Sequence, residues 1–405
     1  MSLAVFAHSP DLQKLRDDGY AVILVNSAAG TVHLLVSDIP YVTPDRRVAR
    51  GTIVTPLGIV ADKAEPPADH TVHFIGEAPC DQHGNRLTNV INSEGVFPIA
   101  NGIDARFYFS NKSADGSNFA DHFAKMTHYT NLLEVHAQAL DPSASAKTFP
   151  PVEDTEGTSP FVYADSATSR AGTTVYAERL TLPAIGIVGL GGTGSYVLDF
   201  VAKTPVGEIH LFDGDDLLSH NAFRAPAAAT LDELQARPKK VDYYATKYSA
   251  MKRQVIPHPY ALTGDNAAEL ASMSFVFLCM EGGTTKRQLV ESLEAHGISF
   301  VDVGMGVQAT TSGLAGSVQV TTSTEQQRDH LRQRVQLVDI DEDDIYEHNI
   351  QIAELNALNA ALAVIKWKKL LGFYRDEAGE HYSAYRVDSN DLINDVTAES
   401  AESAA

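Results

Sequence analysis

A glycine-rich turn between an apolar strand and a helix constrains the fold of this chain more than any other feature. The apolar run at residues 185–188 predicts a buried strand, and residues 195–203 predict the helix that follows it. Glycines between them allow a tight turn, let backbone N–H groups approach an anion, and direct that anion to the positive end of the helix. The sequence therefore predicts a phosphate-binding loop shaped by Gly189, Gly191, Gly192 and Gly194.

Strands and helices alternate along the chain after this loop, which is typical of a parallel sheet. We expect further strands at residues 208–212, 275–279 and 299–303, and a closing helix at residues 350–371. The earlier part of the chain mixes strand-like runs at residues 20–25, 32–36 and 72–75 with a helix at residues 119–140. The expected fold class is α/β, a Rossmann-like, mostly parallel sheet with helices on both faces, preceded by a smaller α+β domain.

Composition changes along the chain indicate the domain boundaries. Residues 143–164 are rich in Pro, Ser, Ala and Thr with interspersed acids, so we expect a linker there. The linker separates an N-terminal domain at residues 1–142 from an ATP-binding domain at residues 165–390. The small and acidic residues 391–405 are expected to form a disordered tail.

The charge balance excludes several kinds of partner. The formal net charge is −21, from 52 acidic and 31 basic residues, so nucleic acid and anionic membranes should be repelled. Two cysteines are too few for a disulfide framework or a four-cysteine zinc site within one chain. The first residues lack the pattern of a signal peptide, and no apolar run is long enough to span a membrane, so the expected location is the cytoplasm.

The residues after the second strand distinguish an ATP site from a dinucleotide site. Asp213 ends that strand and suits ribose binding in either case. The stretch Asp213-Gly214-Asp215-Asp216-Leu217-Leu218-Ser219-His220-Asn221-Ala222-Phe223-Arg224 resembles the Asp-x-Asp…Asn-x-x-Arg signature of the ThiF/MoeB/HesA superfamily, relatives of the ubiquitin-activating enzymes. The resemblance covers roughly residues 165–372. It implies an adenylyltransferase that uses Mg²⁺ and ATP.

The resemblance assigns roles to individual residues. Asp213, with Asp215 beside it, belongs to the ribose side of the site, while Asn221 and Arg224 face the ATP phosphates. Guanidinium suits phosphate because it offers a planar fork of donors. A lysine is expected shortly afterwards; Lys239 and Lys240 are both candidates, and the family pattern favours Lys240.

Two further roles depend on the resemblance alone. Arg170 matches an arginine that reaches across a homodimer into the neighbouring ATP site in relatives, and a plain loop arginine is an equal alternative. Glu281 lies in Cys279-Met280-Glu281-Gly282, where the family has Cys-Thr-Asp-Asn. A carboxylate there can ligate Mg²⁺, although the extra methylene changes the geometry.

This chain departs from the family pattern in the residue expected to accept the activated acyl group. Relatives often use a cysteine in a crossover loop, and the matching residues 303–317 contain none. Three routes stay open: transfer to a partner protein, either conjugating-enzyme-like or another thiol or amine acceptor; an oxyester on Ser312 or Thr311; or Cys80 of the N-terminal domain. We favour the partner. The N-terminal domain resembles extensions that precede bacterial ThiF-type domains, and its chemistry is not assigned.

The function implied by the resemblance is ATP-dependent adenylation of the C-terminal glycine carboxylate of a ubiquitin-like protein, with release of pyrophosphate. One alternative is a catalytically degenerate pseudoenzyme that serves as a binding partner in such a pathway. Another is an NAD-dependent oxidoreductase, which the Asn-x-x-Arg run disfavours.

Overall fold

The computed structural model describes residues 3–113, 116–154, 157, 159–338 and 350–395. The chain forms two compact units. Unit 1 comprises Met1–Thr158 and Tyr163–Gly172, and unit 2 comprises Ser159–Val162 and Thr173–Ala405. Among the described residues, no helix combines the length and the apolar character needed to cross a bilayer.

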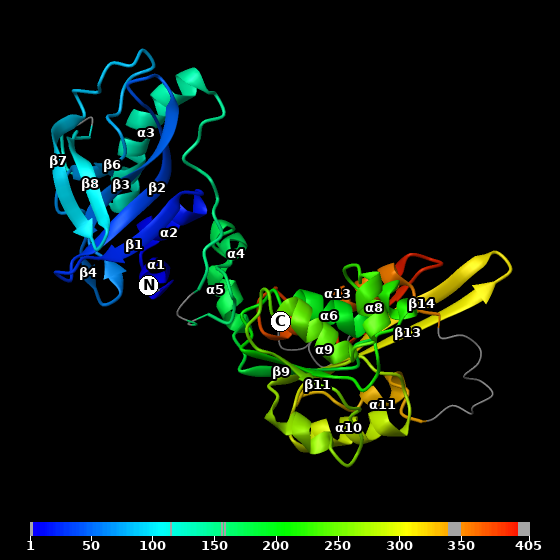
Figure 1. The fold of residues 1–405 in the computed structure, drawn as a ribbon. Coiled ribbons are helices and arrows are strands. Elements are labelled where there is room, and N and C mark those ends of the chain that lie inside the picture. The colour runs from blue at the N-terminus through cyan, green and yellow to red at the C-terminus, as the bar shows by residue number, and fades with distance from the viewer. Residues whose placement is uncertain (1–2, 114–115, 155–156, 158, 339–349, 396–405) are drawn as a thin grey trace. The chain divides into compact units, whose positions relative to one another are not determined.

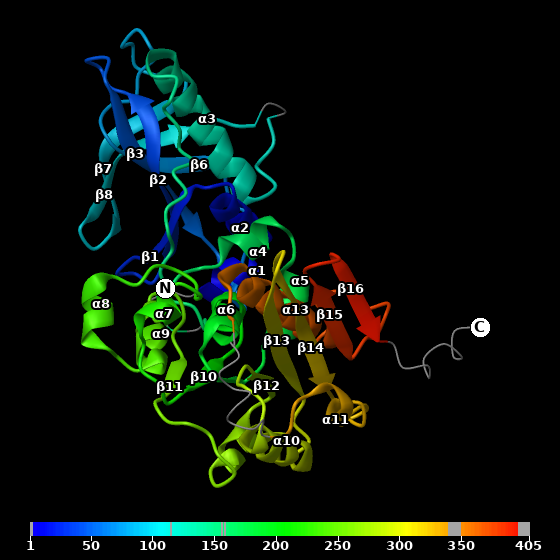
Figure 2. The same cartoon turned by 90° about the vertical axis from the view of Figure 1, so that its right-hand side faces the viewer.

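Unit 1 is an antiparallel sheet with a long helix packed on it (Figure 2). The strand order is β1-β2-β3-β6-β8-β7, and a small β4–β5 ladder accompanies the sheet. The core beneath helix α3 is built from large apolar and aromatic side chains such as Phe74, Phe107 and Tyr129. The elements are β1 (Ala21–Asn26), β2 (Val32–Val42), β3 (Val48–Leu57), β4 (Ile59–Val60), β5 (Lys63–Ala64), β6 (Thr71–Ile75), β7 (Ile91–Ala100), β8 (Ile103–Ser110), α1 (Leu3–His8), α2 (Pro10–Asp17), α3 (His122–Leu140) and α4 (Ser166–Arg170).

Unit 2 is an eight-stranded sheet in the order β11-β10-β9-β12-β13-β14-β15-β16 (Figure 1). Strands β11 to β13 run parallel, and β14 to β16 continue the sheet antiparallel. The strands are β9 (Ala184–Val188), β10 (Glu208–Phe212), β11 (Val255–His258), β12 (Phe275–Leu278), β13 (Phe300–Thr310), β14 (Gly313–Ser323), β15 (Tyr382–Arg386) and β16 (Asp391–Asp395). The α/β class with a preceding antiparallel sheet is therefore confirmed.

Helices cover both faces of this sheet, which explains why its central strands are continuously apolar. In β9, Ile185 and Ile187 pack on the side of α6, α9 and α13, whereas Ala184 and Val188 pack on the side of α10, α11 and η2. The helices are α5 (Thr174–Ala177), η1 (Glu178–Leu180), α6 (Gly192–Val201), α7 (Ser219–Ala222), α8 (Leu231–Ala236), α9 (Lys240–Tyr248), η2 (Ala267–Ser272), α10 (Thr284–Ala295), α11 (Leu331–Arg334) and α13 (Ala353–Leu370).

The chain leaves β9 for β10 on one side and returns to β12 on the other. Such a reversal opens a crevice at the carboxyl ends of the strands, where ligands of open α/β sheets bind. The glycine-rich turn lies at this point, directly after β9.

The hairpin of β13 and β14 is longer than the strands beside it (Figure 1). Strand β12 pairs with β13 only from Phe300 to Asp302, and β15 pairs with β14 only from Ser317 to Thr321. The outer half of the hairpin therefore extends beyond both neighbouring strands. We had expected a strand only at residues 299–303.

Parts of two segments are folded although their composition predicts a disordered tail and a linker. Residues 391–395, expected in the acidic tail, form β16 and pair with β15 along its length. Residues 396–405 of that tail lie outside the described residues. In the expected linker, Ala144 and Ala146 are buried, and Phe149 N donates to Gly19 O at 2.9 Å within unit 1.

Candidate functional site

The glycine-rich turn presents the amino end of α6 without a side-chain cap. Gly189 has a φ of +86°, which favours glycine, and its N–H donates to Phe212 O at 2.8 Å. Gly191 is the N-cap of α6, and a Cβ added there would meet no described atom within 4 Å. The first amides of a helix lack intrahelical partners, so the open space at Gly191 suits an anion such as phosphate.

Two other glycines are required by close packing. A Cβ on Gly194 would overlap the carbonyl oxygen of Gly189, and a Cβ on Gly192 would overlap the side-chain amide of Asn356. The four glycines therefore have different physical roles: Gly189 turns the backbone, Gly192 and Gly194 allow close contact, and Gly191 leaves room for a ligand.

Asp213 joins the loop to the second strand. Its Oδ2 accepts a hydrogen bond from Leu190 N at 2.7 Å, and its Oδ1 accepts one from Asp215 N at 2.9 Å. The side chain is buried beside the loop, whereas the carboxylate of Asp215 is 76% exposed. Asp213 thus fixes the turn and stands at the ribose side of the predicted site.

The structure separates the two lysine candidates. Lys240 is buried at the start of α9; its Nζ lies 2.7 Å from Asp215 Oδ2 and 3.5 Å from Asp213 Oδ2. Lys239 instead pairs with Asp216 at 2.9 Å, and its side chain is 41% exposed. Hydrogen bonding to Asp216 raises the pKa of Lys239. Of the two ammonium groups, that of Lys240 contacts Asp213, which in turn accepts a hydrogen bond from the glycine-rich loop at Leu190.

Asn221 and Arg224 lie on and just after the short helix α7. The buried Asn221 accepts a hydrogen bond from Leu218 N through Oδ1 at 2.9 Å, which fixes this turn. The half-buried Arg224 keeps its Nε away from solvent, and that donor has no hydrogen-bond partner among the described residues. A buried guanidinium nitrogen without an acceptor costs free energy, so this donor suits an anionic ligand.

Sequence reasoning missed Asn356, which ties the parts of the site together. This buried residue of α13 accepts a hydrogen bond from Thr193 Oγ1 at 2.9 Å and directs its amide toward Arg224 O at 3.5 Å. One side chain thus links the first turn of α6 to the segment of Arg224. The signal available was a polar residue at helical spacing from Asn359, within an otherwise apolar stretch of the expected closing helix.

A buried ion pair links α10 to β13, next to the carboxyl end of β12. Lys286 Nζ of α10 lies 2.6 Å from Asp302 Oδ1, and each side chain is 4% exposed. Burial raises the pKa of Asp302, while Lys286 opposes the rise. The pair lies near Cys279, whose thiol pKa burial raises, with a further increase from Asp302. The loop that bears the exposed Glu281 connects β12 to α10, and the ion pair holds the helix that follows this loop against β13.

No group of three or more His, Cys, Asp or Glu side chains in the described parts of the chain is placed to hold a metal ion. Magnesium needs no such cage, because one or two carboxylates and the phosphates of a nucleotide usually suffice. The role of Glu281 as a Mg²⁺ ligand therefore stays a prediction.

The remaining predicted residues belong to unit 1 or to the hairpin of β13 and β14. Cys80 is buried in unit 1, where burial raises its thiol pKa, which disfavours it as an acyl acceptor. Arg170 ends α4, also in unit 1, with its guanidinium 4.9 Å from the centre of the Phe149 ring. Ser312 is exposed at the turn between β13 and β14, and its Oγ lies 3.3 Å from Thr310 Oγ1.

Comparison with protein families agrees with this geometry. The model of the ThiF family matches residues 168–396, more than half of the chain. The chain belongs to the ThiF family. The match includes every element from β9 to β16, and it identifies unit 2 as an adenylyltransferase-type nucleotide-binding domain. A second family model, for a domain of unknown function named DUF6791, matches residues 10–166.

Several solved structures resemble part of the chain. PaaA is 17% identical over 55% of this chain and 75% of its own, with a TM-score of 0.44. E. coli MccB with MccA-N7isoASN is 14% identical over 55% of this chain and 66% of its own, with a TM-score of 0.46. E. coli MccB with ATP is 13% identical over the same shares, with a TM-score of 0.41. Comparison with curated protein sequences gave no match.

Proposed function

We propose that the ThiF-family domain uses Mg²⁺ and ATP to adenylate the carboxyl terminus of a peptide or protein, with a ubiquitin-like protein as the expected substrate. The observation that carries the proposal is the buried Nε of Arg224, which lacks an acceptor among the described residues. Asn356 links its segment to the uncapped amino end of α6. Donors from two separate elements thus stand ready for one polyanion.

The chemistry follows from these groups. A carboxylate oxygen of the substrate attacks the α-phosphorus of ATP, a new P–O bond forms, and the bond to the bridging oxygen breaks, so that pyrophosphate leaves with the electron pair. Arg224 and Lys240 stabilise the negative charge that develops on the phosphoryl oxygens. Asp213 would hold the ribose, and Glu281 would ligate the Mg²⁺ that neutralises charge on the phosphates.

The activated acyl group then passes to a partner protein. This route is supported by the two cysteines of the chain, because burial raises the pKa of both thiols and lowers their reactivity at neutral pH. Nucleophilic attack needs the thiolate, so an exposed thiol or amine on the partner is the better acceptor.

Thermal unfolding of the full chain with Mg·ATP or with NAD tests which nucleotide the chain binds. ATP–pyrophosphate exchange with candidate ubiquitin-like proteins tests whether the chain catalyses adenylation. We expect Mg·ATP, and not NAD, to raise the unfolding temperature. Arg224→Ala should weaken ATP binding by about 100-fold, because a charge-assisted hydrogen bond contributes about 2–3 kcal/mol. The exposed Arg287→Ala on α10 is the matched control and should behave as wild type.

The outcomes separate the proposal from its alternatives. Stabilisation by NAD rather than ATP would indicate an oxidoreductase. Binding of Mg·ATP without exchange for any candidate would favour a non-catalytic binding subunit. Exchange that survives Arg224→Ala would show that Arg224 does not contact the phosphates.

A further inference from the structure

A chain of four hydrogen bonds crosses β10 and β11, at the edge of the eight-stranded sheet (Figure 2). On one side, His210 Nε2 lies 3.1 Å from Glu208 Oε2, and His210 Nδ1 lies 3.0 Å from His258 Nε2. On the other side, His258 Nδ1 lies 3.0 Å from the hydroxyl oxygen of Tyr260, which donates to Glu269 Oε2 at 2.6 Å. These five residues form an imidazole array with a carboxylate at each end.

Ring stacking fixes the two imidazoles in this arrangement. The centres of the His258 and Phe212 rings are 4.2 Å apart, and their planes differ by 9°. The centre of the His210 ring lies 5.2 Å from that of His258, with the planes 14° apart. A ring that turns to break one of the hydrogen bonds therefore also loses its stacking.

The hydrogen bonds determine how many protons the two imidazoles hold. A carboxylate only accepts, so His210 Nε2 carries a proton to donate to Glu208. Because the hydroxyl proton of Tyr260 is directed at Glu269, His258 Nδ1 must donate to the hydroxyl oxygen. A third proton lies between the two rings. Three protons on four ring nitrogens make one imidazolium and one neutral imidazole, so the complete array holds one proton more than two neutral histidines carry.

The groups around the rings favour one such proton and oppose a second. The hydrogen bonds bring three titratable groups to the two imidazoles: Glu208 from β10, Tyr260 after β11 and Glu269 from η2. Burial lowers the pKa of His258, the neighbouring His210 lowers it further, and Glu269 opposes the fall. The bond to Glu269 raises the pKa of the Tyr260 hydroxyl, which therefore stays a donor at neutral pH. When the shared proton leaves at higher pH, one of the four hydrogen bonds must break.

The array borders the backbone that carries Asp213. His258 O accepts a hydrogen bond from Asp213 N at 3.4 Å, and the His258 ring stacks on Phe212, the residue before Asp213. Gly214, the residue after Asp213, packs closely on the segment that follows β11, because an added Cβ would lie 3.0 Å from Ala261 N. A shift of His258 or of the segment after β11 is therefore transmitted to the turn of Asp213.

We infer that His258 and Tyr260 are positioning residues for Asp213, and that the one proton shared by His210 and His258 makes nucleotide affinity depend on pH. The inference rests on the proposed function, because Asp213 stands at the ribose side of the proposed ATP site. The protonated array makes all four bonds and holds the turn in place, so Mg·ATP binds more tightly while the proton is present. By linkage, bound Mg·ATP strengthens the hold of the array on this proton by the same factor.

Isothermal titration calorimetry of the full chain with ATP in excess Mg²⁺, between about pH 6 and about pH 8.5, measures this dependence. The dissociation constant of wild type should rise about fivefold over this range, the fold-change expected when one hydrogen bond is lost. His258→Gln cannot hold the shared proton and should show no such rise. Tyr260→Phe should also lose the rise, because His210 and His258 then satisfy the two remaining bonds as neutral imidazoles.

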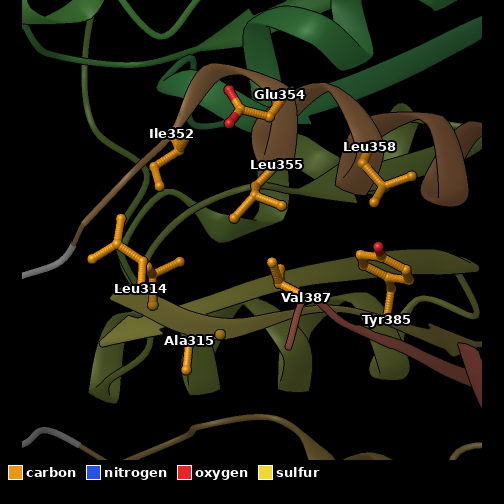
Figure 3. A pocket seen from close by; sticks show the side chains of 10 residues that line it. Leu314, Ala315, Ile352, Glu354, Leu355, Leu358, Tyr385 and Val387 are labelled. Atoms are coloured by element: carbon orange, nitrogen blue, oxygen red, sulfur yellow. The ribbon is translucent and has the colours of Figure 1, made fainter. Parts of the chain in front are cut away.

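Tyr385→Phe is the matched control. The Tyr385 hydroxyl donates to Asn390 Oδ1 at 2.8 Å, and the residue lines an apolar groove between α13 and the strands β14 and β15 (Figure 3). These strands lie toward the other edge of the sheet from β10 and β11. This variant also loses one hydrogen-bonded hydroxyl, yet it should keep the fivefold rise of wild type. Nitrogen NMR of the histidine-labelled full chain at low pH should show the proton shared between the rings, and His258→Gln should lack that signal.

The inference is overturned if wild type, His258→Gln and Tyr260→Phe share one pH dependence, if Tyr385→Phe loses it, or if no shared proton is seen. A wild type that binds Mg·ATP with equal affinity across the range keeps the proposed function and loses the role of the array. A wild type that binds no Mg·ATP at any pH refutes both.

Discussion

The buried pair of Lys286 and Asp302 offers a quantitative test of how the site is held together. Both side chains are 4% exposed and 2.6 Å apart, so neither charge has access to water if its partner is removed. Loss of one partner from a buried ion pair costs about 3–5 kcal/mol. We expect Lys286→Met and Asp302→Asn each to lower the free energy of unfolding by that amount at neutral pH.

The double variant Lys286→Met/Asp302→Leu should behave differently. With both charges replaced by apolar groups, no uncompensated charge is left behind, and the unfolding free energy should return to within about 2 kcal/mol of wild type. The coupling energy between the two positions is then at least about 4 kcal/mol. A double variant that costs the sum of the two single variants would refute this reasoning, as would single variants that cost under about 1 kcal/mol.

The chain supplies its own probe for this measurement. Its one tryptophan, Trp367, is fully buried in the ThiF-family unit, so urea unfolding followed by tryptophan fluorescence reports on that unit within the full chain. The pH dependence has a definite sign. Burial raises the pKa of Asp302, and without Lys286 it rises further, so Lys286→Met should be less destabilising at pH 5 than at pH 8.

Two further predictions concern other parts of the same unit. Gly194→Ala should abolish Mg·ATP binding and destabilise the fold, because its Cβ would overlap Gly189 O. Gly191→Ala should lower only the affinity for the nucleotide and leave urea unfolding unchanged, because its Cβ would meet open space. Equal stability of the two variants would contradict the assignment of their roles. Lys252 is fully buried and donates to Thr204 O at 2.9 Å, and burial lowers its pKa to about 8. The unfolded chain holds this proton up to a higher pH than the folded chain does. The free energy of unfolding of wild type should therefore rise by about 1.4 kcal/mol per pH unit, relative to Lys252→Met, between about pH 8 and 10.5. Parallel pH profiles of the two unfolding free energies, measured by urea unfolding, would refute this prediction.

The parts of the fold that local chemistry dictates could be predicted from the sequence. The glycine turn after an apolar strand is defined by neighbouring residues, so the loop from Gly189 to Gly194 and helix α6 follow from it. The preference for Lys240 over Lys239 as the phosphate-binding lysine stays a prediction; the structure shows that Lys240 is buried beside Asp213.

Contacts between distant segments could not be predicted in this way. Asn356 lies 163 residues from Thr193, and nothing in its own helix marks it as the partner of the loop. The sequence leaves Cys80 open as an acyl acceptor, yet packing of unit 1 buries its thiol. Strand β16 escaped notice because its five residues are exposed and it is defined by pairing with β15 rather than by an apolar pattern.

The two-sided use of helix α13 limits how this domain can vary. Leu355 and Asn356 point to different surfaces because consecutive residues of an α-helix are rotated by about 100°. An insertion of one residue inside the first turns would rotate both sets of side chains out of register, removing Asn356 from Thr193 of α6 and Leu355 from its packing against Val307 and Val318 in a single event.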